Sequence, residues 1–259
     1  MISIKNPDQI GKMREAGALL HEVLQKLREA VQPGMSTAAL DVYAEQLIRK
    51  NYAIPTFLNY GGYPATICAS IDDEVVHGIP SEKRILKEGS IISIDCGLML
   101  DGWQADSAFT IGIGEISAEA QRLIDVTEQC FWAGVRQAVA GNRLGDMGHA
   151  IQTLAEGKGY GVVRDLTGHG IGRNMHEDPS VPNFGRPGHG TRLRAGMTLA
   201  IEPMITMGDY HVAELEDGWT IVTEDGSFCS HYEHTIAINE KGLPEILSFP
   251  GYVLTEDAE

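Results

Sequence analysis

One predicted hairpin constrains the fold of this chain more than any other feature. Residues 91–111, IISIDCGLMLDGWQADSAFTI, contain two apolar runs on either side of Asp101-Gly102. Asp-Gly is a preferred centre for a two-residue hairpin turn with both φ angles positive. This turn places Gly97 opposite Asp106. Because side chains alternate along a strand, Asp95 shares that face and lies diagonal to Asp106, about 7–8 Å away at the backbone.

The acids of these strands need a compensating charge. An ionised carboxylate among apolar side chains is costly unless something pairs with it, and residues 91–111 contain no Lys or Arg. Glu202 in TLAIEPMI and Glu233 in HYEHTIAI lie in similar settings. Each alone could be an edge-strand acid with its carboxylate in water. Four such acids favour a site for divalent first-row metals, and a pair of such ions is common in hydrolases.

Histidines supply the candidate nitrogen ligands and hydrogen-bond donors. His169 lies in TGHGIG, where the flanking glycines allow other groups to approach closely. The same glycines could form a phosphate cradle, but the segment that follows is broken by proline and predicts no helix. His77 and His176 lie in loops, where a single histidine more often faces solvent. His234 should point away from Glu233, because neighbours on a strand alternate faces.

The order of predicted elements indicates an internal duplication. Apolar residues at steps of three and four predict helices over about residues 7–31 and 37–50, from about residue 118, and within LGDMGHAIQTLAEGKG. Strands and glycine-rich loops follow each helix pair. We therefore expect an α+β fold with a site between two halves. The expected organisation is one domain over residues 1–259, with halves of about 1–116 and 117–250 and a short acidic C-terminal tail.

Composition excludes some classes of partner. The formal net charge is −16, from 20 basic and 36 acidic residues. A field of that sign repels nucleic acid and anionic membranes and attracts cations. The four cysteines show no CxxC spacing, and apolar surroundings favour buried free thiols at Cys96 and Cys130. No stretch reads as a signal peptide or a membrane span, so we expect a cytoplasmic protein.

The motifs resemble those of the methionine aminopeptidases, of the shorter bacterial type I. The resemblance covers nearly the whole chain. It rests on Asp95, Asp106, His169 in GHGIG, Glu202 in IEP and Glu233 in YEHT, with GYP at Tyr63, HGIP at His77 and MHEDP at His176. It implies the pita-bread (creatinase/aminopeptidase) fold. In that fold two pseudo-twofold-related halves have curved antiparallel sheets covered by helices.

The resemblance also implies the roles of individual residues. Asp106 and Glu233 would bridge two divalent metals, and water between the metals would attack the first peptide bond. Glu202 would be the general base, His176 would stabilise the developing oxyanion, and His77 would contact the scissile nitrogen. The metal ligands implied are Asp95, Asp106, His169, Glu202 and Glu233. The methionine pocket implied is Tyr60, Tyr63, Cys68 and Trp219, beside His77 and His176. Fe(II), Mn, Co and Zn all suit such ligands.

Three positions depart from the pattern. Met175 stands where Phe is expected, and Phe57 stands where some members carry Cys. Both would reshape the rim of the pocket. His231 stands where Gln is usual, two residues before Glu233. It would either add a nitrogen near the metals or face away. We favour a position in which it contacts the ligands and not the metals.

The expected activity is removal of N-terminal methionine when the second residue is small. The partners expected are nascent polypeptide N-termini, with the ribosome as a candidate place of encounter and a monomeric enzyme. One alternative is an X-Pro dipeptidase or aminopeptidase of the same fold, which usually carries an extra N-terminal domain. Another is a non-catalytic member that binds protein or RNA, which should have lost ligands.

Overall fold

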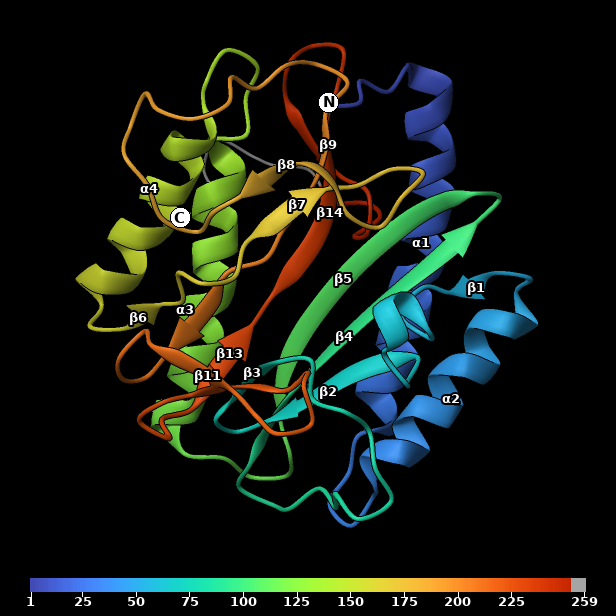
Figure 1. Cartoon of the computed structure of the whole chain (residues 1–259), viewed down its shortest axis with the longest axis vertical. Coiled ribbons are helices and arrows are strands. Elements are labelled where there is room, and N and C mark those ends of the chain that lie inside the picture. The colour runs from blue at the N-terminus through green and yellow to red at the C-terminus, as the bar shows by residue number, and fades with distance from the viewer. Residues whose placement is uncertain (253–259) are drawn as a thin grey trace.

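The computed structural model describes residues 1–252, so the predicted acidic tail lies largely outside the described residues. Within this part of the chain are four α-helices, on the two flanks of a curved sheet (Figure 1). They are α1 (Pro7–Ala30), α2 (Thr37–Lys50), α3 (Ala118–Arg136) and α4 (Leu144–Gly157). No helix among the described residues is long and apolar enough to cross a membrane.

Side-chain caps fix where three of the helices begin. The Asn6 side chain accepts a hydrogen bond from the Gln9 amide, and the Gln9 side chain accepts one from the Asn6 amide. The two bonds form a capping box at the start of α1. Ser36 and Ser117 cap α2 and α3 in the same position. The predicted bounds of α2 are confirmed, and α1 ends at Ala30 with Val31 as its C-cap, close to the predicted end at about residue 31.

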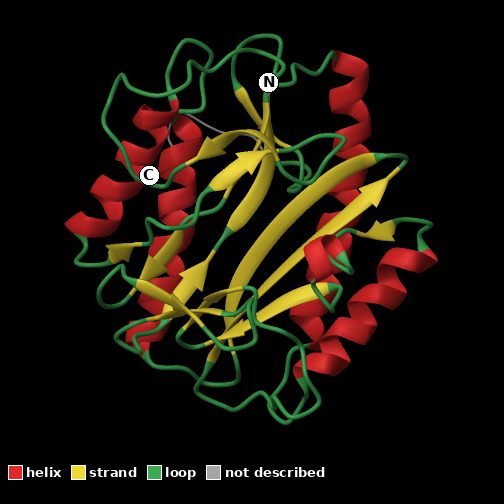
Figure 2. Cartoon of the chain, in the orientation of Figure 1, coloured by secondary structure: helices red, strands yellow, loops and turns green. Residues whose placement is uncertain are grey.

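A nine-stranded antiparallel sheet forms the centre of the described structure (Figure 2). Its main path runs β1 (Ile54–Pro55), β4 (Ile91–Leu100), β5 (Trp103–Gly112), β14 (Glu233–Ile238), β9 (Thr198–Ile201), β7 (Gly168–Gly170) and β8 (Glu177–Val181). Two further strands join it, β2 (Ile67–Ile71) beside β4 and β15 (Pro244–Ile246) beside β14.

Two three-stranded sheets complete the described strands. One consists of β13 (Cys229–His231), β10 (Met204–Thr206) and β6 (Gly161–Val162). The other consists of β11 (Val212–Glu214), β12 (Ile221–Thr223) and β3 (Glu74–Val76). A short 3-10 helix, η1 (Tyr60–Gly62), lies between β1 and β2. The predicted α+β class is confirmed.

The predicted hairpin is β4 and β5. Asp101 and Gly102 form its turn with φ angles of 50° and 77°, and Gly97 pairs with Asp106, so the predicted register is confirmed. Asp95 pairs with Ala108, which in turn pairs with Glu233 across the next strand. Three acids on one face of adjacent strands thus lie around one small side chain.

Two hydrophobic cores hold the helices against the strands. One joins α1 and α2 to β4 and β5, around Leu20, Leu27 and Ile94. The other joins α3 and α4 to β9 and β14, around Phe131 and Ile236. The three acids of β4, β5 and β14 therefore lie where strands from both cores meet.

Candidate metal centre

Four neighbouring strands each contain one of the predicted metal ligands, and the fifth ligand directly follows the strand between two of them. Along the sheet, Asp95 comes from β4, Asp106 from β5 and Glu233 from β14. Glu202 directly follows β9, and His169 is the middle residue of β7. Residues far apart in the chain are thus brought into one row by strand pairing alone.

Hydrogen bonds to the backbone fix several of these strands at the ligands. The Asp106 amide donates to Thr235 Oγ1, which itself donates to the Asp106 carbonyl oxygen, at 2.9 and 2.8 Å. Ser107 Oγ donates to the Glu233 carbonyl oxygen at 2.6 Å, and Asn183 Nδ2 donates to the Glu202 carbonyl oxygen at 2.9 Å. The ligand side chains therefore extend from a rigid base.

The side chains converge on one point. His169 Nε2 lies 3.6 Å from Asp106 Oδ2 and 3.8 Å from Glu202 Oε1. Asp106, His169 and Glu233 each offer a ligand atom within 4.8 Å of the other two, and all three are buried. His169 Nδ1 lies 2.9 Å from the Gly170 carbonyl oxygen, to which it can donate. That tautomer leaves the Nε2 lone pair free for a metal.

The four carboxylates are in an unfavourable environment without a cation. Burial and then the neighbouring acids raise the pKa of Asp95, Glu202 and Glu233 well above their usual values. Burial raises the pKa of Asp106 to about 8. Three buried oxygens of these four carboxylates find no hydrogen-bond partner among the described residues: Asp95 Oδ1, Asp106 Oδ1 and Glu233 Oε1.

A divalent metal centre fits these residues. Carboxylate oxygens with imidazole nitrogen form a donor set that first-row ions accept, and a cation would offset both the burial and the mutual repulsion. Among the described residues, the ion pairs of these acids involve only histidines and no Lys or Arg. A bound divalent ion would supply the positive charge that no Lys or Arg among these residues supplies.

A pocket of about 170 Å³ opens onto the acids. Tyr63 and Trp219 form an edge-to-face pair at 5.1 Å between ring centroids, and the Tyr63 hydroxyl donates to the carbonyl oxygens of Ile67 and Gly78. Burial raises the pKa of the Cys68 thiol well above its usual value, so Cys68 acts as an apolar wall. Besides four ligand acids and His169, the lining is Phe57, Tyr60, Tyr63, Cys68, His77, His176 and Trp219.

Both loop histidines line this pocket rather than facing only solvent. His176 Nδ1 lies 2.8 Å from the Tyr60 hydroxyl, and its ring lies 4.3 Å from the His169 ring. Burial, and then His169, lower the pKa of His176 to about 4. Burial, and then His176, lower the pKa of His77, whose φ of 61° is in the left-handed region. Such strain is concentrated at functional sites.

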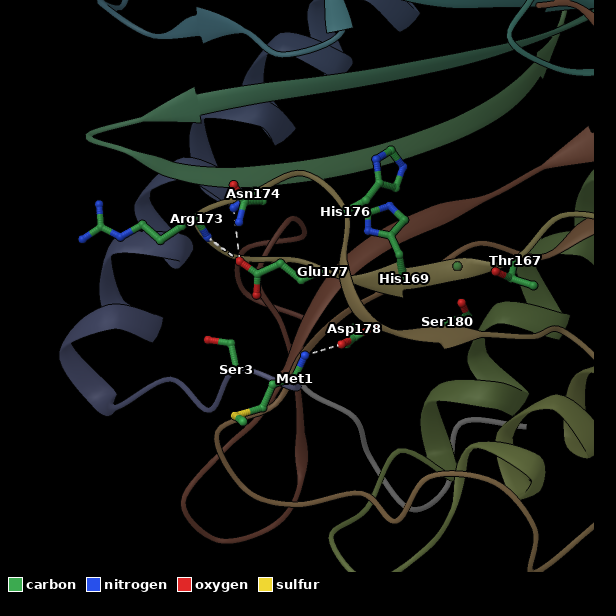
Figure 3. Close-up of a pocket in the computed structure, with 11 residues that line it drawn as sticks. Met1, Ser3, Thr167, His169, Arg173, Asn174, His176, Glu177, Asp178 and Ser180 are labelled. Atoms are coloured by element: carbon green, nitrogen blue, oxygen red, sulfur yellow. Dashed lines mark hydrogen bonds and ion pairs between the residues drawn. The ribbon is translucent and has the colours of Figure 1, made fainter. Parts of the chain in front are cut away.

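The segment that carries His176 is anchored by an ion pair that sequence reasoning missed. Glu177 Oε1 accepts hydrogen bonds from the amides of Arg173 and Asn174, as Figure 3 shows. Its other oxygen lies 2.7 Å from Lys5 Nζ, and both side chains are nearly buried. Lys5 and Glu177 are 172 positions apart in the sequence, so no local sequence pattern indicates that they pair.

A wider, polar cavity of about 730 Å³ adjoins the same histidines (Figure 3). His169 and His176 belong to its lining as well as to that of the smaller pocket. At its edge the Met1 ammonium lies 2.5 Å from Asp178 Oδ2. The two cavities thus share two histidines of β7 and of the segment before β8.

The three departures from the pattern lie at the site. Phe57 lines the pocket, and Met175 is buried beside it. A Cβ added to Gly97 would lie 2.4 Å from Met175 Cε and 2.9 Å from Phe57 Cε1, so Gly97 leaves room for both side chains. His231 does not face away, because its Nε2 points toward Glu202 and Glu233.

Comparisons with known proteins agree with this geometry. The model of metallopeptidase family M24 matches residues 11–240. A methionine aminopeptidase of Clostridium acetobutylicum is 56% identical over 248 residues, which cover 96% of this chain and 99% of that relative. The crystal structure of methionine aminopeptidase from Thermotoga maritima matches with a TM-score of 0.93 and 43% identity, and covers 96% of this chain and 99% of that one.

A more distant match shows the fold alone. The Xaa-Pro dipeptidase from Bacillus anthracis is 23% identical, with a TM-score of 0.76 over 97% of this chain and 63% of that one. The predicted pita-bread fold is confirmed by these structural matches.

Proposed function

This chain belongs to metallopeptidase family M24 and removes N-terminal methionine from polypeptides, and we propose that it does so with two divalent metal ions at the centre described above. The observation that carries the proposal is the buried cluster of Asp106, His169 and Glu233, whose ligand atoms lie within 4.8 Å of one another, with Glu202 Oε1 3.8 Å from His169 Nε2. The proposed ligands are Asp95, Asp106, His169, Glu202 and Glu233.

The ions and the protein have separate tasks. Bound there, the ions would lower the pKa of water and polarise a carbonyl group. Asp106 and Glu233 are the proposed bridging carboxylates, a role that the resemblance to the methionine aminopeptidases implies, and both belong to the buried cluster with His169. Fe(II), Mn(II), Co(II) and Zn(II) all remain compatible with the donors.

Glu202 is the proposed general base. Its side chain is only 14% exposed, and it borders the pocket where the peptide bond must lie. A carboxylate there can take the proton of the attacking water and pass it to the leaving amine. His176, with its ring held by Tyr60, would donate a hydrogen bond to the substrate carbonyl oxygen as negative charge develops. His77 would contact the scissile nitrogen.

The pocket suits the methionine side chain. Tyr63, Cys68 and Trp219 offer aromatic and sulfur surfaces, which make favourable contacts with a thioether. A small second residue is the preference that the resemblance to the methionine aminopeptidases implies. The free α-amine would complete the ion coordination, and this requirement makes the enzyme an exopeptidase.

The setting of the reaction is also proposed. Four buried free thiols suit the reducing cytoplasm. The substrates would be nascent polypeptides as they leave the ribosome, and the enzyme would act as a monomer without direct contact with nucleic acid or membrane.

A peptide assay after anaerobic purification tests the proposal. The purified protein is analysed for metal and offered a Met-Gly peptide beside an X-Pro peptide. We expect cleavage of the methionyl peptide that is lost with chelator and restored by a divalent ion. Cleavage of the X-Pro peptide alone would favour the alternative activity of the same fold, and absence of both metal and turnover would favour a binding protein.

A further inference from the structure

His231 is a buried histidine whose ring has no partner among the described residues. It ends β13 and is 1% exposed, and neither Nδ1 nor Nε2 makes a hydrogen bond. Its backbone is held firmly: the His231 amide donates to Thr110 Oγ1 at 3.0 Å, and Thr110 Oγ1 donates to the His231 carbonyl oxygen at 2.8 Å. These bonds fix the backbone position from which the buried ring extends.

Such a ring needs an explanation. A buried polar group without a hydrogen bond costs about 1–3 kcal/mol, so native proteins almost always supply a partner from the chain, from water or from an ion. No other described side chain fills that role for either nitrogen. The missing partner of His231 must be a species other than the protein.

The position of Nε2 points to an ion as that species. It lies 3.8 Å from Glu202 Oε2 and 3.8 Å from Glu233 Oε2. Both distances exceed that of a hydrogen bond. Donor atoms that share one ion at about 2.0–2.2 Å lie roughly 3–4 Å apart, which is the separation found here.

His169 provides an internal comparison. Its Nε2 lies 3.6 Å from Asp106 Oδ2 and 3.8 Å from Glu202 Oε1. Glu202 thus lies between two imidazoles, with one facing each carboxylate oxygen. The Nε2 atom of each histidine thus lies 3.6–3.8 Å from two carboxylate oxygens, and the two rings face different oxygens of Glu202.

We propose that His231 is a sixth protein ligand of the metal centre, through Nε2. The inference rests on the proposed function, since it requires the ions. A second imidazole shifts the donor set toward nitrogen, which suits Co(II), Ni(II), Cu(II) and Zn(II), whereas carboxylate and water suit Mn(II). This centre is therefore more selective against Mn(II) than a centre with one imidazole.

Pulsed EPR on the Cu(II)-loaded protein tests the inference directly. The metal-free protein receives two equivalents of divalent ion, a small part Cu(II) and the rest Zn(II), so that isolated Cu(II) ions sample both positions and their remote imidazole nitrogens count the bound rings. Over both positions we expect two imidazoles in the wild type, one in His231→Gln and two in the control His211→Gln, whose exposed ring lies against Asp209 and Tyr210. A single imidazole over both positions in the wild type would overturn the inference, and this count holds even if His231→Gln does not fold.

Metal competition gives a second readout and separates the two proposals. His231→Gln should lose affinity for Co(II) by at least roughly 10-fold, and lose less for Mn(II). Equal losses for both ions would contradict a nitrogen ligand. A wild type that binds ions with one imidazole refutes only the role of His231, whereas a wild type that binds no divalent ion refutes the metal centre itself.

Discussion

Lys5 and Glu177 form a nearly buried ion pair, with Nζ and Oε2 2.7 Å apart, which ties the N-terminal segment to the strand that follows His176. The side chains are 3% and 11% exposed. The other oxygen of Glu177 binds the amides of Arg173 and Asn174. One carboxylate therefore fixes both ends of the short segment that presents His176 to the pocket.

Lys5→Met should destabilise the protein by about 3–5 kcal/mol, because it leaves the Glu177 carboxylate buried and unpaired. It should also lower kcat while metal content stays unchanged, since His176 loses its fixed position. The control is Arg49→Met, which breaks the exposed pair with Glu45 and should cost at most about 1 kcal/mol. Urea unfolding and Met-Gly turnover measure both effects. Equal behaviour of the two variants would show that the pair does not hold the segment.

Stability should depend on the ionisation of Glu177 in acid. Burial alone would raise the pKa of Glu177, but hydrogen bonds from Lys5, Asn174 and Arg173 hold it below the usual 4.5. A depressed pKa gives stability that is present above about pH 4.5 and is lost as pH falls through the folded value. The stability gap between wild type and Glu177→Gln should thus narrow below pH 4.5 in urea unfolding of the metal-free proteins. A gap independent of pH would contradict this account.

Asp106→Asn should abolish turnover and reduce metal affinity by at least roughly 100-fold, because a central carboxylate loses its charge. Metal should raise the unfolding free energy of the wild type by about 2.7 kcal/mol at 100 times Kd and leave the variant nearly unchanged. Thermal unfolding with and without Co(II) measures this difference. Asp101→Asn, in the exposed hairpin turn, is the matched control and should behave as the wild type. An active, fully metallated Asp106→Asn protein would refute the bridging role.

Glu202→Gln should reduce kcat by about 10²–10⁴-fold, the usual contribution of a general base. It should retain more metal than Asp106→Asn, since the amide oxygen can still bind an ion. Metal analysis beside Met-Gly kinetics separates the two losses. Turnover close to that of the wild type would exclude Glu202 as the base.

Local chemistry made much of the fold predictable. The Asp101-Gly102 turn determines which residues of the hairpin face each other, so the sequence indicated the register of Gly97 and Asp106. Ser36 is the N-cap of α2, so the start of this helix at Thr37 could be predicted from the sequence. The halves of about 1–116 and 117–250 stay a prediction.

Long-range contacts were not predictable in the same way. The environment of His77 and His176 depends on loops that meet only in three dimensions, so each alone was expected to face solvent. Lys5 and Glu177 show no periodicity that links them. The direction of the His231 ring depends on the register of β13 with β10, where it pairs with Met204, and that pairing cannot be read from one strand.

The most direct test of the central claim is the number of divalent ions that the wild-type chain binds. Metal-free protein is dialysed anaerobically against Co(II) or Mn(II), and the bound ions are counted per chain as Met-Gly turnover returns. The account predicts two tightly bound ions, with turnover that rises as they bind. Full turnover with no bound ion, or saturation at a single ion, would contradict a two-ion centre formed by the five strands.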